Sequence, residues 1–259
     1  MTNNKTIGII LSAGFQTRFD SIMPKTLMMY DDHQTILEKN IDTMLNFCDI
    51  IYVVINVKSL SESYEFIVNK YIGVKLISIN SGLGDGHAVL QSLRYINRIS
   101  TFLPNDRVFL VWGDSIQDEK SLFKSTLNSY NESFTLPVKY ESDPYVQFII
   151  TDTYINGVKF KRYNDDVSSG YHDYSLFLFN PITMLVVLTL HDENNWNNED
   201  KMYTCRNNEL VFLDIVNDYN SMLHPSVVII DESGNTSINA FNTYEEYKKL
   251  INRGLEKWQ

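Results

Sequence analysis

The chain has 259 residues, of which 44% are hydrophobic and 21% charged, and its formal net charge is -10. This composition excludes a disordered chain, and the acidic balance argues against nucleic acid as a partner, because like charges repel. Small phosphates remain possible ligands, since a few backbone N–H groups and cations are enough to hold them.

No apolar run approaches the roughly 18 residues that span a membrane, and the polar first residues do not resemble a signal peptide. The two cysteines, Cys48 and Cys205, form no CxxC pair, so neither a zinc site nor a redox motif is supported. We therefore expect a cytoplasmic protein with no membrane partner and two reduced thiols.

Strands and helices are expected to alternate along the first half of the chain. The strands are continuous apolar runs, typical of parallel strands covered on both faces, and the helices carry apolar residues at helical spacing. In chain order we expect a strand at 7–11, a helix at 35–47, a strand at 50–55, a helix at 61–71, a strand at 74–79, a helix at 88–99 and a strand at 107–112. This alternation predicts a Rossmann-like, doubly wound α/β fold that binds ligands at the carboxyl ends of its strands.

The second half is less regular and makes the expected sheet a mixed, mostly parallel one. Its expected strands are 134–138, 145–151, 158–162, 175–179 and 226–230, and its expected helices are 210–219 and 243–258. The polar stretch 191–208 is expected to be a loop or a loose helix end. No repeat or linker divides the chain, so we predict a single domain over 1–259, with two halves that meet near residue 134.

A small-residue loop follows the first expected strand and brings two cations with it. Leu11-Ser12-Ala13-Gly14 offers backbone N–H groups that can approach a phosphate closely, and Arg18 and Lys25 follow within one loop. Nucleotidyl transfer needs such fixed positive groups, because charge spreads over the phosphate oxygens. A tight turn with two surface cations is the alternative for the loop alone.

The fourth expected strand ends in Trp112-Gly113-Asp114. A carboxylate just past a buried strand is well placed to hold Mg²⁺, which prefers one or two carboxylates together with substrate phosphates. The alternative is an aspartate that caps the next turn. The phosphate loop at the neighbouring strand favours the metal role.

The order of these residues resembles the signature of nucleotidyltransferases with the sugar-nucleotide pyrophosphorylase fold, a nucleotide-diphospho-sugar transferase, GT-A-like architecture. Their pattern is small-Ala-Gly-x-Gly-Thr-Arg followed by Pro-Lys, and this chain departs from it at Gln16. The resemblance implies that Arg18 and Lys25 are catalytic. It also implies that the nucleotide contacts Leu11, Ser12, Ala13, Gly14, Trp112 and Gly113.

A second stretch, Leu83-Gly84-Asp85-Gly86-His87-Ala88, is similar to the Leu-Gly-Thr-Gly-His-Ala segment of bacterial N-acetylglucosamine-1-phosphate uridyltransferases. The resemblance implies that Gly84 and Asp85 contact the base and ribose, although Asp85 replaces a threonine. Asn80 lies near the place of the family's uracil-contacting glutamine. The chain shows no hexapeptide repeat, so the acetyltransferase part of those enzymes is not implied.

The same resemblance implies the metal and acceptor residues. Ala240-Phe241-Asn242-Thr243 looks like the family's Val-Asn-Asn segment, which makes Asn242 the second Mg²⁺ ligand beside Asp114, with a helix N-cap as the alternative. At the acceptor positions the chain carries Lys161, Arg162 and Asp173. The cations would hold an acceptor phosphate, and the alternative is a solvated strand edge.

The family implies a nucleotide-binding half of about 1–133 and an acceptor-binding half of about 134–259. The expected reaction joins a nucleoside triphosphate, UTP by preference, to a sugar 1-phosphate, with UDP-N-acetylglucosamine and pyrophosphate as the favoured products. A cytidylyl- or other nucleotidyltransferase with a different phosphorylated acceptor stays open. So does an inactive regulatory protein that binds nucleotide-sugars. A GT-A glycosyltransferase is disfavoured because Gly113-Asp114-Ser115-Ile116 contains no Asp-x-Asp motif.

Overall fold

The structure is a computed structural model that describes residues 4–14, 23–80, 82–117, 119–231 and 244–248. The expected catalytic Arg18, the departure at Gln16 and the expected metal ligand Asn242 lie outside these residues. Of the C-terminal helix expected at 243–258, only residues 244–248 are described, and they are helical.

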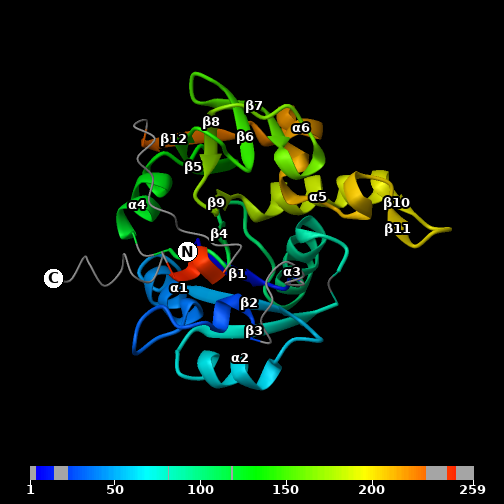
Figure 1. Ribbon diagram of the computed structural model, residues 1–259. Coiled ribbons are helices and arrows are strands. Elements are labelled where there is room, and N and C mark those ends of the chain that lie inside the picture. The colour runs from blue at the N-terminus through cyan, green and yellow to red at the C-terminus, as the bar shows by residue number, and fades with distance from the viewer. Residues whose placement is uncertain (1–3, 15–22, 81, 118, 232–243, 249–259) are drawn as a thin grey trace.

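The first half forms the parallel part of the sheet, as the sequence predicts. Strands β4, β1, β2 and β3 lie side by side in this order and are all parallel, and they are joined by helices in the expected places (Figure 1). The bounds are β1 Thr6–Ser12, α1 Ile36–Met44, β2 Ile50–Asn56, α2 Ser61–Val68, β3 Val74–Ile79, α3 Asp85–Ile99, β4 Arg107–Trp112 and α4 Lys120–Asn128.

Two hydrophobic cores cover the two faces of this sheet, which explains why its strands are apolar throughout. Alternate residues such as Ile9 and Leu110 join the core under α3 and α5. Their neighbours, such as Ile10 and Phe109, join the core under α1, α2 and α4. Because side chains alternate across a strand, a strand covered on both faces needs apolar residues at every position.

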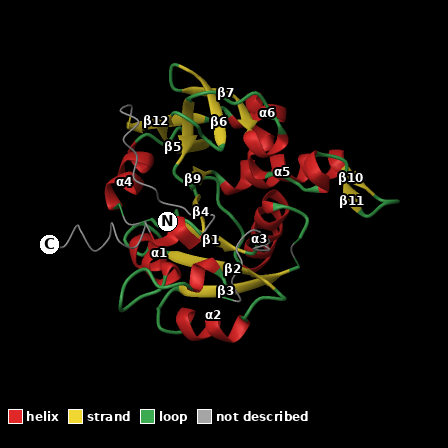
Figure 2. Cartoon of the chain, viewed as in Figure 1, coloured by secondary structure: helices red, strands yellow, loops and turns green. Residues whose placement is uncertain are grey.

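The second half extends the sheet to ten strands in the order β12-β7-β6-β8-β5-β9-β4-β1-β2-β3 (Figures 1 and 2). β9 joins the halves, since it runs antiparallel to both β4 and β5. The parallel pairing of β12 with β5 brings the late strand back to the middle of the sheet. The bounds are β5 Phe134–Glu141, β6 Val146–Thr151, β7 Tyr154–Phe160, β8 Gly170–Asp173, β9 Leu176–Phe179 and β12 Ser226–Asp231.

Several elements of this half differ from expectation. The strand expected at 158–162 is β7 and ends at Phe160, so Lys161 and Arg162 lie on a short 3-10 helix, η2 (Lys161–Tyr163). β8 was not anticipated. Neither was α5 (Pro181–Asn195), which takes in the start of the polar stretch 191–208; that stretch then forms the hairpin of β10 (Trp196–Asn197) and β11 (Met202–Tyr203).

Helix α5 lacks a clear apolar stripe, which is why periodicity did not reveal it. Its start carries a readable signal: the Asn180 side chain accepts hydrogen bonds from the N–H groups of Ile182 and Thr183 at 3.0 and 3.1 Å, and Pro181 occupies the first turn.

The helix expected at 210–219 is broken into shorter turns, η4 (Phe212–Asp214), α6 (Ile215–Asp218) and α7 (Asn220–Leu223). Within the described ranges, no helix is both long and apolar enough to cross a bilayer.

Candidate active site

The loops after β1 and β4 meet at the carboxyl edge of the sheet. The Gly113 N–H donates to the Leu11 carbonyl oxygen at 2.9 Å. A Cβ at Gly113 would collide with the Ser12 hydroxyl and would lie 2.8 Å from Cγ2 of Thr26. Only glycine therefore allows the β4 loop to approach the turn at Ser12-Ala13-Gly14 so closely.

Lys25 and Asp114 form an ion pair at this junction. Lys25 lies on a 3-10 turn, η1 (Lys25–Leu27), and is only 5% exposed, while its Nζ lies 3.4 Å from Oδ2 of Asp114. The Asp114 side chain keeps 45% of its surface exposed. A buried ammonium thus stands beside a carboxylate that solvent and ligands can still reach.

The described residues fit Mg²⁺ in one specific way. No group of three or more His, Cys, Asp or Glu side chains that could enclose a metal occurs among them. Mg²⁺ seldom uses an all-protein cage, however, and is commonly held by one or two carboxylates, waters and substrate phosphates. Asp114, with nearly half of its side chain accessible, suits this second kind of site.

The turn between β8 and β9 brings Asp173 to the same edge. β9 pairs with the last residues of β4, and the Trp112 N–H donates to the Ser175 carbonyl oxygen at 3.2 Å. Asp173 is buried, and its Oδ1 accepts a hydrogen bond from the Ser175 N–H at 2.7 Å. Burial raises the pKa of Asp173, and the positive charges of His172 and Lys139 act against this rise.

Lys139 is a buried cation that the sequence argument missed. It lies in β5, is 3% exposed, and its Nζ stands 5.2 Å from the centre of the Tyr174 ring. β5 runs in the same direction as β4, because both are antiparallel to β9, so its carboxyl end points to the edge that carries Asp114. A single lysine directly after the apolar run 134–138 was the available signal.

Lys161 and Arg162 have different surroundings. Lys161 is exposed, and its Nζ lies 2.6 Å from each carboxylate oxygen of Asp143. Arg162 is half-buried, and its guanidinium lies 4.5 Å from the centre of the Tyr163 ring. In the part of the chain that the structure describes, the buried Arg162 Nε has no hydrogen-bond partner. The two cations thus differ in their surroundings, and an acceptor role for either residue remains a prediction.

Gly84, Asp85 and Gly86 join the first half of the chain to the segment before α6. Gly84 has φ +103°, and a Cβ there would lie 2.8 Å from the backbone N of Leu210. The Gly86 N–H donates to the Leu210 carbonyl oxygen at 2.8 Å. Both glycines are therefore required by close backbone packing, a role that the motif alone did not reveal.

The Asp85 side chain points into this junction. Its Oδ1 accepts hydrogen bonds from the N–H groups of Gly86 and Phe212, both at 2.8 Å. Burial raises the pKa of Asp85, and the Phe212 N–H and the Arg162 charge act in the opposite direction. Asp85 therefore holds the first turn of α3 against residues 210–212, and a contact with ribose remains a prediction.

Two other expected nucleotide residues differ in exposure. The Trp112 ring packs edge-on against Phe212 and is tilted against Phe177, at 5.6 and 5.1 Å between ring centres. The Trp112 ring is thus part of an aromatic cluster, and the backbone of Trp112 is the part of the residue that lies at the end of β4. Asn80 follows β3 and is exposed.

A second group of charges surrounds Asp214, which is buried. Arg206 Nη1 lies 2.7 Å from Oδ2 of Asp165, and its Nε lies 3.5 Å from Oδ1 of Asp214. Burial raises the pKa of Asp214 from 3.8 to about 6; the Arg206 charge opposes the rise and the Asp218 charge adds to it. Asp214 therefore titrates between mildly acidic and neutral pH.

This titration predicts a pH-dependent stability. Between about pH 4 and pH 6 the folded chain keeps a proton on Asp214 that the unfolded chain releases, so stability falls as the pH rises through this range, by up to about 3 kcal/mol. Asp214→Asn cannot ionise. We expect its stability relative to the wild type to rise by about that amount between about pH 4 and pH 7, as measured by urea unfolding. The control Asp152→Asn, at an exposed carboxylate, should show no such change, and parallel curves for Asp214→Asn and wild type would contradict the assignment.

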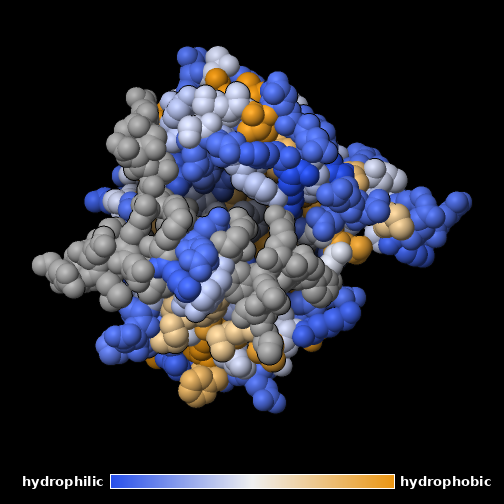
Figure 3. Space-filling view, viewed as in Figure 1, coloured by the Kyte–Doolittle hydropathy of each residue, from blue (hydrophilic) through white to orange (hydrophobic). Residues whose placement is uncertain are grey.

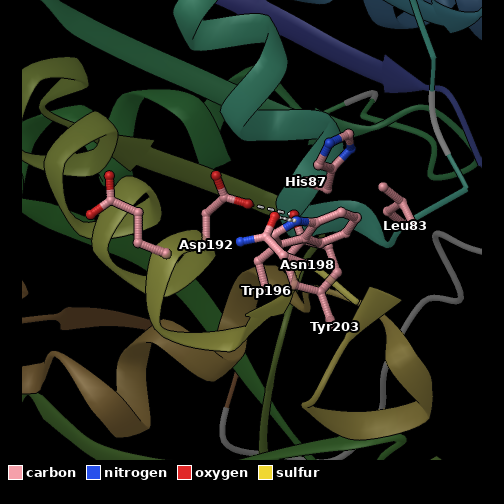
Figure 4. A pocket seen from close by; sticks show the side chains of 7 residues that line it. Leu83, His87, Asp192, Trp196, Asn198 and Tyr203 are labelled. Carbon is pink, nitrogen blue, oxygen red and sulfur yellow. Dashed lines mark hydrogen bonds between the residues drawn. The ribbon is translucent and has the colours of Figure 1, made fainter. Parts of the chain in front are cut away.

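A cavity of about 340 Å³ lies between α3, the end of α5 and the β10–β11 hairpin (Figure 4). Asp192, which accepts a hydrogen bond from the Tyr203 hydroxyl at 2.6 Å, forms one wall, and Trp196 packs edge-on against Tyr203. Burial lowers the pKa of His87, the histidine of the second motif, whose ring faces this cavity. The residues that line this cavity do not include Lys25 or Asp114.

A separate hollow is visible in Figure 3. It lies between the part that carries β5–β8 and the part that carries β1–β3.

No family model and no curated protein matches the sequence. Solved structures do resemble the fold. CTP:phosphocholine cytidylyltransferase from Streptococcus pneumoniae (LicC) is 16% identical, with 96% of this chain and 99% of that chain covered and a TM-score of 0.69. The inositol-1-phosphate CTP transferase from T. maritima is 17% identical, with 98% and 97% covered and a TM-score of 0.69. HddC from Yersinia pseudotuberculosis, in complex with GMP-PN, is 14% identical, with 96% and 99% covered and a TM-score of 0.65. The likeness establishes the mixed α/β fold predicted from the sequence.

Proposed function

We propose that this protein is a nucleotidyltransferase that joins the nucleoside monophosphate part of a nucleoside triphosphate to a phosphorylated small molecule and releases pyrophosphate. The observation that supports it most is the ion pair of buried Lys25 with accessible Asp114, where the loops after β1 and β4 meet. The acceptor half adds Asp173 and Lys139 at the same edge. Cations near an accessible carboxylate suit the handling of a metal-bound triphosphate.

In the proposed reaction, an oxygen of the acceptor phosphate attacks the α-phosphorus in line. The bond from the α-phosphorus to the oxygen that bridges the β-phosphorus breaks, and this oxygen leaves with pyrophosphate. The acceptor is already ionised near neutral pH, so no general base is needed. Lys25, and Arg18 by resemblance, stabilise the negative charge of the transition state, and Asp114 with Asn242 would hold Mg²⁺, which neutralises phosphate charge.

CTP is the nucleotide that we now favour over UTP. Two of the similar structures are CTP-dependent transferases according to their names, which give phosphocholine and inositol 1-phosphate as the acceptors. The Asp85 side chain, which replaces the threonine of the uridyltransferase motif, is engaged with backbone N–H groups. UDP-N-acetylglucosamine synthesis remains the second candidate, because the segment Leu83–Ala88 resembles that family.

A substrate panel tests the proposal. Each of the four nucleoside triphosphates is combined with phosphocholine, inositol 1-phosphate or N-acetylglucosamine 1-phosphate in the presence of Mg²⁺, and both pyrophosphate and the nucleotide product are measured. Asp114→Asn serves as the control for contaminating activity. We expect CTP to give the highest rate. Nucleotide binding without pyrophosphate from any combination would favour the inactive regulatory protein instead.

Arg162 and Lys161 offer a matched test of the acceptor site. We expect Arg162→Ala to raise the KM for the acceptor about 10- to 100-fold, because a charge-assisted hydrogen bond to an anion contributes about 1.5–3 kcal/mol. Lys161→Ala should change it less than about twofold, since an exposed ion pair contributes little. Steady-state kinetics with varied acceptor measure both. Equal effects of the two variants would contradict the assignment of Arg162.

A further inference from the structure

The loop that carries Asp114 is unusually well buried for a connection between a strand and a helix. Ser115 and Gln117 are 1% and 2% exposed, and Gly113 is also buried. Among residues 113–117, Asp114 has the most accessible side chain. Within residues 113–117, the accessible Asp114 carboxylate is therefore held in a place that its buried neighbours determine.

Asn40 of α1 hydrogen-bonds to this loop through both the nitrogen and the oxygen of its carboxamide. Its Nδ2 donates to the Ser115 carbonyl oxygen at 2.8 Å, and its Oδ1 accepts from the Gln117 N–H at 2.9 Å. Asn40 is fully buried, as are both hydrogen bonds. The Asn40 carboxamide therefore makes the two hydrogen bonds that a neighbouring strand would otherwise make to the backbone that directly follows Asp114.

Two further hydrogen bonds fix the loop from other sides. The Gln117 Nε2 donates to the Tyr174 carbonyl oxygen at 2.8 Å, which ties the loop to the turn that carries Asp173. The Gly113 N–H donates to the Leu11 carbonyl oxygen, which ties it to β1. The loop is thus anchored to α1, to β1 and to the β8–β9 turn. These anchors place Asp114 relative to the loop after β1, which we propose binds the triphosphate, and to the second half of the chain.

We propose that Asn40 is a positioning residue that holds Asp114 where it can receive the divalent cation carried by the nucleotide; this inference rests on the proposed function. Without the carboxamide, the Ser115 carbonyl and the Gln117 N–H would be buried without partners. A buried polar group without a partner is unfavourable, and the loop can avoid this cost by moving toward water. Such a movement carries Asp114 away from Lys25. Groups that orient a metal ligand commonly change metal affinity 10- to 100-fold.

The test compares Asn40→Ala with the control Thr126→Val. Thr126 is also fully buried, and its hydroxyl donates to the Leu122 carbonyl oxygen at 2.8 Å inside α4, so its replacement also removes a buried hydrogen bond but leaves the loop intact. Both variants are compared with wild type in Mn²⁺ binding, followed by electron paramagnetic resonance in the presence of an unreactive α,β-methylene CTP. Thermal unfolding and steady-state kinetics are measured in parallel.

We expect Asn40→Ala to weaken Mn²⁺ binding at least about tenfold and to lower kcat, with the acceptor KM little changed. Thr126→Val should keep its Mn²⁺ affinity within about twofold even if both variants lose similar stability. If Asn40→Ala does not fold, Asn40→Ser, which retains one hydroxyl, is measured instead with the same expectation.

Unchanged Mn²⁺ affinity in a folded Asn40 variant, beside an active wild type, would overturn this inference alone. A wild type that neither binds the metal–nucleotide complex nor transfers a nucleotidyl group would overturn the proposed function itself.

Discussion

Replacement of Asp114 by asparagine is expected to abolish most nucleotidyl transfer, with a fall of about 10²- to 10³-fold in kcat/KM. The amide keeps the size of the side chain but loses the negative charge that attracts a hard cation. Because nearly half of the Asp114 side chain is exposed, the fold should persist, but the buried Lys25 ammonium loses its counter-charge, so a lower melting temperature is expected. Initial rates of pyrophosphate release at varied nucleotide concentration, including concentrations well below KM, measure the effect.

Asp143→Asn is the matched control for this variant. Asp143 also pairs with a lysine, Lys161, at a shorter distance of 2.6 Å, but both of these side chains are exposed. Loss of an exposed pair should leave kcat/KM within about twofold. If Asp114→Asn were as active as Asp143→Asn, the metal role of Asp114 would be wrong.

Replacement of Lys25 by methionine should separate catalysis from stability. The methionine side chain is similar in length, so it can fill the buried site of a residue that is 5% exposed. We expect kcat to fall about 10²- to 10³-fold, because a fixed positive charge that faces the transition state is lost. Stability should be unchanged or increased, since a buried ion pair often costs as much in desolvation as it gains. Single-turnover rates and urea unfolding measure the two effects.

Lys25→Arg provides the control for charge alone. It restores a positive charge, but the larger planar group does not match the geometry of an ammonium in a buried site, so only partial recovery of the rate is expected. A Lys25→Met variant that kept more than about one tenth of the wild-type rate would show that Lys25 is retained for structure.

The first half of the fold and the central pair of the site were predictable from local sequence. Continuous apolar runs such as Ile7–Leu11 identify strands buried on both faces, and the carboxyl-end rule then brings the loops of β1 and β4 together. It thereby places Lys25 beside Asp114, although 89 positions separate them in the sequence. The roles of Arg18 and Asn242 stay predictions, because both residues lie outside the described part of the chain.

The second half of the chain was less predictable because its short antiparallel strands depend on distant partners. That β7 ends at Phe160, so that Lys161 and Arg162 fall on a 3-10 turn, is decided by the pairing with β6 rather than by the local pattern. Lys139 becomes a candidate only once β5 is known to run parallel to β4, with β9 between them.

The sequence by itself determined the parallel core, the small-residue loop and the types of residue that its chemistry needs, since these follow from hydrophobic periodicity and from local backbone demands. Only the tertiary structure decided that Gly84 and Gly86 pack against Leu210, that Asp85 faces Phe212, and that Asn40 holds the loop of Asp114. The reason is physical: burial and hydrogen-bond partners arise between distant segments, such as Asp85 and Phe212, which are 127 positions apart, and a local pattern does not specify which distant backbone group will lie beside it.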